Sequence, residues 1–94
     1  MSDYETAATY SCECGRIRDM SQIVSIAQSY PDHNISITFG GRQFDAKNIF
    51  EMCELLCCGI NGKAVTIRVS GEKSGCGKAA EEIKHYLEEG WKRI

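Results

Sequence analysis

Thiols and arginines gather near the N-terminus of the chain, in the stretch "SCECGRIRD" at residues 11 to 19. It contains Cys12, Cys14, Arg16 and Arg18. A thiolate is a nucleophile and a metal ligand, and neighbouring arginines lower the pKa of a thiol. Arginine also binds phosphate and carboxylate groups. The stretch therefore predicts either reactive thiols at the two cysteines or a weak phosphate, sulfate or carboxylate contact at the two arginines.

The remaining cysteines do not complete a familiar metal pattern. The chain has six cysteines, at positions 12, 14, 53, 57, 58 and 76. Disulfides are typical of secreted proteins, but "MSDYETAATY" lacks the basic region and apolar run of a secretory signal. Neither the one-residue gap of Cys12 and Cys14 nor the adjacent Cys57 and Cys58 has the two-residue spacing of a zinc knuckle. We therefore expect reduced thiols in the cytoplasm, no metal and no cofactor, with a redox or metal role as an alternative.

Length and composition predict one soluble domain over residues 1–94, with its core at about 6–91. The 94 residues are 43% apolar and 26% charged, and the net charge is −2. These values are ordinary for a globular protein and give no basic surface for nucleic acid or membrane. The longest apolar run, "LLCCGI", is too short to span a bilayer.

The first half of the chain predicts a strand, a helix and a hairpin. Residues 5–12 are suited to a strand. Apolar residues recur at helical spacing over 20–30, with Asp19 as the expected N-cap, and Pro31 ends that helix. The alternation in "NISITF", followed by Gly40 and Gly41, predicts a strand and a two-residue turn into a return strand.

The second half predicts a helix, a strand and a final helix. Asn48 is expected to cap the second helix with Glu51 as its reciprocal partner. Cys53 and Cys57 fall on the apolar face of that helix, which favours core packing over chemistry. "KAVTIRVSG" alternates as a strand, and the last helix is expected over 78–91.

A glycine-rich stretch and two histidines could suggest a phosphate-binding or catalytic site, but neither feature supports one. "GEKSGCGKA" lacks the spacing and the hydroxyl of a phosphate-binding P-loop, so it predicts only a flexible entry to the last helix. His33 and His85 are expected on the surface.

The element order β-α-β-β-α-β-α predicts an α+β open-faced β-sandwich. In it a four-stranded antiparallel sheet carries three helices on one face. Alternation and helical spacing together predict a shared set of core residues: Ile23, Ile37, Phe39, Val65, Ile67, Ile83 and Leu87.

This order, with "ISITFGGRQFDAKNIFEMCELL", "GKAVTIRVSGE" and "AAEEIKHYL", resembles HPr, the phosphocarrier family of the bacterial sugar phosphotransferase system. The resemblance covers roughly residues 6 to 90. The family carries a G-L-H-x-R-P-A loop before its first helix, whose histidine accepts a phosphoryl group. Aligned without gaps, Arg16 falls on that histidine, Arg18 on the arginine and Asp19 on the proline.

The resemblance also implies that both phosphorylation sites of the family are changed. Arg16 stays protonated and has no nucleophilic lone pair, and no histidine precedes His33. Asn48 replaces the serine that some members phosphorylate for regulation, so it can cap a helix but offers no hydroxyl.

We therefore expect a regulatory, protein-binding variant that is not an enzyme. Its partners would be components of the phosphotransferase system or transcription regulators. The family's partner face corresponds to six residues here, expected to be accessible: Arg16, Arg18, Met20, Asn48, Phe50 and Met52. The alternative is a true phosphocarrier with a cysteine or a displaced histidine as acceptor.

Overall fold

The computed structural model describes residues 4–11, 17–60 and 62–89. They form seven elements in the predicted order: β1 (Tyr4–Ser11), α1 (Ile17–Gln28), β2 (Asn34–Phe39), β3 (Arg42–Asp45), α2 (Ile49–Cys57), β4 (Ala64–Gly71) and α3 (Lys73–Glu89).

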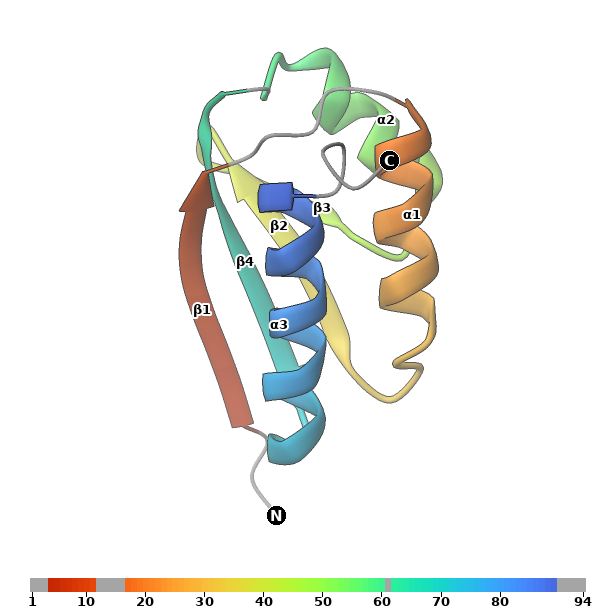
Figure 1. Cartoon of the computed structure of the whole chain (residues 1–94), viewed down its shortest axis with the longest axis vertical. Coiled ribbons are helices and arrows are strands. Elements are labelled where there is room, and N and C mark those ends of the chain that lie inside the picture. The colour runs from red at the N-terminus through yellow and green to blue at the C-terminus, as the bar shows by residue number, and fades with distance from the viewer. Residues whose placement is uncertain (1–3, 12–16, 61, 90–94) are drawn as a thin grey trace.

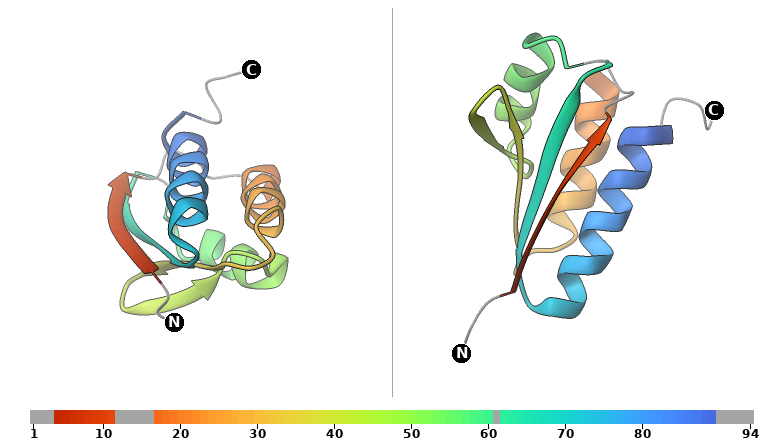
Figure 2. Two further views of the ribbon diagram at one scale, coloured as in Figure 1. Left: turned by 90° about the horizontal axis from the view of Figure 1, so that it is seen from below. Right: turned by 90° about the vertical axis from the view of Figure 1, so that its left-hand side faces the viewer.

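The four strands form one antiparallel sheet in the order β1-β4-β2-β3. The three helices lie over one face of this sheet, and its other face is open (Figures 1 and 2). The predicted α+β open-faced sandwich is thus confirmed. Within the described residues, no helix combines the length and apolar character needed to cross a bilayer.

The core lies between the sheet and the helices. Val65, Ile67 and Val69 alternate along β4 and are buried, because successive side chains of a strand point to opposite faces. Other members of the predicted core are buried as well, namely Ile23, Ile37 and Ile83. Phe39 is only partly buried at its edge, and the side chain of Leu87 lies outside the described part of the structure.

The hairpin between β2 and β3 has the predicted two-residue turn. Gly40 and Gly41 have φ angles of 62° and 79°. Both angles lie in the left-handed region, where a side chain would add strain, so the pair of glycines sets the register in which Phe39 faces Arg42.

α1 begins earlier than predicted, so Asp19 is not its N-cap. The helix starts at Ile17, which places Asp19 in the first turn. Asp19 is 1% exposed, and its carboxylate accepts a hydrogen bond of 2.8 Å from the Tyr86 hydroxyl of α3. Sequence spacing around Asp19 resembles a cap, but the long-range partner that holds it in place cannot be read from neighbouring residues.

α3 also begins early, and the glycine-rich stretch expected to be a flexible entry belongs to its first turns. Glu72 stands before the helix: its carbonyl accepts from the Cys76 amide at 3.0 Å and its carboxylate from the Gly75 amide at 3.3 Å. Hydrogen bonds from the Ser74 hydroxyl and the Gly75 amide lower the pKa of the Glu72 carboxyl. The Glu72 carboxylate thus satisfies the Gly75 amide, one of the amides that a helix leaves free at its start.

His33 packs against this helix start and is 8% exposed, so the prediction of a surface histidine is wrong. Its Nε2 lies 2.9 Å from the Glu72 carbonyl oxygen. Cβ atoms added at Gly71 and Gly75 would lie 2.6 Å and 2.3 Å from ring carbons of His33. Two glycines therefore make room for the imidazole, which accounts for the glycine at position 75 of α3.

Candidate functional site

The expected partner face lies where the start of α1 approaches α2, and these two helices pack against each other. Arg18 in the first turn of α1 is exposed. Phe50 in the first turn of α2 is 79% exposed, which is unusual for a large apolar side chain. The structure therefore offers a cation and an aromatic ring on these two helices.

Two residues expected on this face are in the core instead. Met20 and Met52 both have 0% exposure and belong to the main apolar cluster. The resemblance to HPr placed them on the same face as Phe50, but both side chains are packed in the core. Arg16, Cys12 and Cys14 lie outside the described residues.

The start of α2 is capped by Asn48, as predicted. The Asn48 side-chain oxygen accepts from the amides of Phe50 at 2.9 Å and Glu51 at 3.3 Å. The predicted reciprocal bond is replaced, because the Glu51 carboxylate accepts from the Asp45 amide at 2.8 Å. Asn48 thus supplies the cap that a serine could supply, without a hydroxyl to phosphorylate.

Neither histidine of the sequence lies at the start of α1. His33 follows the C-terminal end of this helix, where its amide donates to the Tyr30 carbonyl at 3.1 Å. His85 is exposed on α3, as predicted. It lines a groove of about 430 Å³ between α1 and α3. The other lining residues are Gln22, Ile26, Glu81, Glu82 and Tyr86.

Carboxylates take part in two contacts between the α1 region and α3. The Tyr30 hydroxyl donates to Glu82, and this hydrogen bond, with burial and the nearby negative charge, raises the pKa of Tyr30 to about 12. Asp19 adds a carboxylate within the first turn of α1, where the helix dipole favours negative charge.

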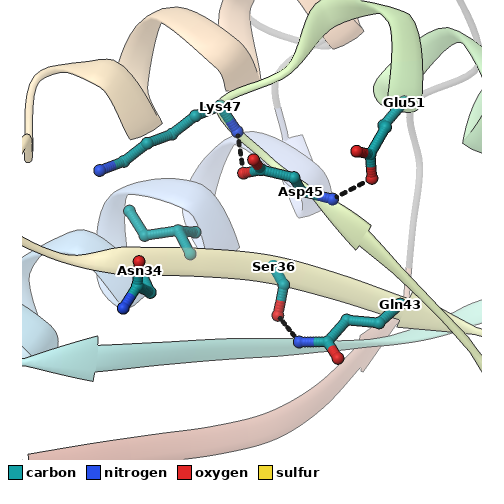
Figure 3. A pocket seen from close by; sticks show the side chains of 7 residues that line it. Asn34, Ser36, Gln43, Asp45, Lys47 and Glu51 are labelled. Carbon is teal, nitrogen blue, oxygen red and sulfur yellow. Dashed lines mark hydrogen bonds between the residues drawn. The ribbon is translucent and has the colours of Figure 1, made fainter.

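A second, polar groove of about 350 Å³ follows β2 and β3 (Figure 3). Gln43 donates to the Ser36 hydroxyl at 2.8 Å, and the Lys47 amide donates to the Asp45 carboxylate at 2.9 Å. The Lys47 ammonium donates to the carbonyl oxygens of Pro31 and His33. These hydrogen bonds hold the chain between β3 and α2 in place. We therefore assign the polar side chains of this groove a structural role.

The cysteines of α2 are not packed in the core as predicted. Cys57 is exposed and Cys53 is only half-buried, while the core residues of this helix are Met52 and Leu55. Cys58 is the C-cap of the helix and is exposed. The prediction placed Cys53 on the buried side of the helix, but the residue one position earlier, Met52, is the one that enters the core.

The chain is similar to known proteins in its three-dimensional structure. No family model and no curated protein matches the chain. Among solved structures, the phosphocarrier protein HPr from Bacillus anthracis str. Ames superposes with a TM-score of 0.76 at 21% identity. The match covers 88% of this chain and 96% of that protein.

The chain has the HPr fold. HPr-C-His from Thermoanaerobacter tengcongensis is also similar, with a TM-score of 0.66 at 15% identity over 97% of this chain and 98% of that one. The resemblance inferred from sequence is thus confirmed at the level of the HPr fold.

Proposed function

We propose that the chain is an HPr-like protein-binding domain related to the phosphoenolpyruvate-dependent sugar phosphotransferase system, and that it carries no phosphoryl group on histidine. In this role it would act in the cytoplasm as a regulatory partner rather than as an enzyme. Its contacts would come from the side where α1 begins and α2 lies.

The positions of the two histidines carry the proposal. His33 sits at the far end of α1 and is buried against α3. His85 is accessible, but Glu81 and Glu82 line the same groove. Two carboxylates beside an imidazole repel a phosphoryl donor, so His85 is a poor substitute acceptor.

Exposed side chains on α1 and α2 support protein binding. Phe50 would be the apolar anchor of the contact, and Arg18, with Arg16 before it in sequence, would meet an acidic group.

Phosphoryl transfer is tested by mass. The purified chain is incubated with the general phosphotransferase enzyme and phosphoenolpyruvate, and an authentic HPr in a parallel reaction confirms that the enzyme is active. We expect no gain of a phosphoryl group by this chain. A stoichiometric gain would overturn the proposal and favour the phosphocarrier alternative, with a cysteine or His85 as acceptor. The variant Arg16→His tests whether an acceptor at the aligned position is sufficient.

Docking is tested separately by NMR with the same unphosphorylated enzyme as probe. We expect amide shifts in α1 and α2 that disappear in a Phe50→Ala, Arg18→Ala variant. Gln43→Ala, on the open side of the hairpin, is the matched control and should bind as the wild type does. Shifts that are absent, or that persist in the double variant, contradict docking through this face.

A further inference from the structure

The outward side of α2 carries three side chains that are not part of the buried core. Phe50, Cys53 and Cys57 stand at positions i, i+3 and i+7, which places them along one side of a helix. Phe50 and Cys57 are exposed and Cys53 is half-buried. The buried side of the helix is formed by Met52 and Leu55, so this stripe is free for other contacts.

Cys53 and Cys57 are spaced as a chelating pair. Side chains four residues apart on a helix lie about 5–6 Å from each other at Cβ. Zn–S bonds of about 2.3 Å allow one zinc ion to bridge two thiolates at that separation. Both cysteines are free thiols in the structure. The pair can therefore supply two of the four ligands of a tetrahedral zinc ion.

The other two ligands are not available in the same chain, as far as the structure describes it. Among the described residues, no group of three or more His, Cys, Asp or Glu side chains could hold a metal ion. Glu54, on the same side of α2, is paired with Arg42 at 2.8 Å. A second copy related by a two-fold axis supplies an identical pair of thiols, because a two-fold contact brings the same patch of both copies together.

We infer that two copies of this chain bind one zinc ion between them through Cys53 and Cys57 of each α2, forming a metal-linked dimer. On binding, the four thiols lose their protons to solvent and the four sulfurs coordinate the ion. No electron transfer is involved. The exposed Phe50 of each copy lies one turn before Cys53 and would be covered by the facing helix.

The metal is necessary for this dimer because the helix alone is too small. A nine-residue helix is about 14 Å long. Its exposed side buries much less than the roughly 1,000 Å² expected of a stable protein interface. Without zinc the chain should therefore be monomeric at this face. This inference does not depend on the proposed function, but it has a consequence for it: a zinc-linked pair and a protein partner would compete for Phe50.

Zinc binding and mass are measured together on the reduced full-length chain. Native mass spectrometry and sedimentation, with stepwise addition of Zn²⁺, should give one metal per two chains and a shift from monomer to dimer, reversed by a chelator. Cobalt(II) in place of zinc should give the intense thiolate charge-transfer absorption of a four-sulfur site. One zinc per monomer, or no zinc bound at all, would overturn the inference.

Matched serine variants assign the ligands. Cys53→Ser and Cys57→Ser should each abolish the metal-linked dimer, while Cys58→Ser, at the exposed neighbouring position, should retain it. Cys12→Ser, Cys14→Ser should retain it too, and loss in that variant would show that the N-terminal thiols are the ligands. Cys53→Ala removes the same thiol without adding a hydroxyl and should also abolish the metal-linked dimer. For each variant, an NMR spectrum of the backbone amides like that of the wild type confirms that the protein is folded.

Discussion

His33 lies so close to Gly75 that a Cβ at position 75 would be crowded by its ring. Replacing a helix-interior glycine by alanine usually stabilises a protein by about 0.5–1 kcal/mol. A Cβ at Gly75 would instead lie 2.3 Å from His33 Cε1 and 2.4 Å from Nε2. We expect Gly75→Ala to lower the free energy of unfolding by about 1–3 kcal/mol, as overpacking does. Urea denaturation followed by circular dichroism measures this change.

Gly77 is the matched control, two residues later in α3. No atom lies within 4 Å of a Cβ added there. Gly77→Ala should therefore stabilise the protein by about 0.5–1 kcal/mol. In addition, His33→Ala should remove most of the penalty of Gly75→Ala when the two are combined. Equal effects at the two glycines would show that His33 does not constrain the helix.

At the scale of elements, the start of α2 depends on one side chain. Asn48 accepts hydrogen bonds from two amides of this helix. Asn48→Ala should cost about 1 kcal/mol in the free energy of unfolding, whereas Asn48→Ser should cost little because serine is an equally good cap. Thermal and urea unfolding compare the three proteins. A serine variant as unstable as the alanine variant would mean that the amide group has a role besides capping.

The hydrogen bond from Tyr30 to Glu82 joins the end of α1 to α3 and makes one tyrosine pH-sensitive. Because the pKa of Tyr30 is about 12, against about 10 in an unfolded chain, folding favours its protonated form. The bond thus contributes stability below about pH 10 and loses it as the pH rises toward 12. Phenolate absorbance of the wild type and of Tyr30→Phe should differ by one tyrosine that ionises late. In Glu82→Gln this tyrosine should ionise near pH 10.

The elements that local patterns determine were predicted well. Alternation gave the strands, and Gly40 and Gly41 gave the hairpin, because both signals act between near neighbours. The starts of α1 and α3 were missed for a different reason. Tyr86 holds Asp19 from 67 residues away, and His33 packs against a glycine 42 residues later, so neither could be read from local sequence.

The candidate site was predicted less well than the fold for a similar reason. Cysteine, methionine and phenylalanine are all apolar, so periodicity alone could not decide which of them α2 buries. The structure buries Met52 and exposes Phe50 and Cys57, because the side of α2 that faces the core is set by its packing against α1 and β3.

At the scale of the whole molecule, the fold depends on the strand that links the two halves of the sheet. β4 pairs with both β1 and β2, and Ile67 stands in it opposite Ala8 and Ile37. Its side chain is 2% exposed and faces the helices. A cavity at this position would therefore loosen contacts that hold the N-terminal strand, the hairpin and the helical layer together.

Ile67→Ala should lower the free energy of unfolding by about 2–5 kcal/mol, a large share of the 5–15 kcal/mol typical of a small domain. Arg68→Ala, at the next position, is the control: its side chain points to the open face and forms an exposed ion pair of 2.9 Å with Glu5. Losing that pair should cost no more than about 1 kcal/mol. Urea unfolding of the two variants compares the buried and exposed sides of the same strand. If Arg68→Ala were the more damaging change, the assignment of the two faces of β4 would be wrong.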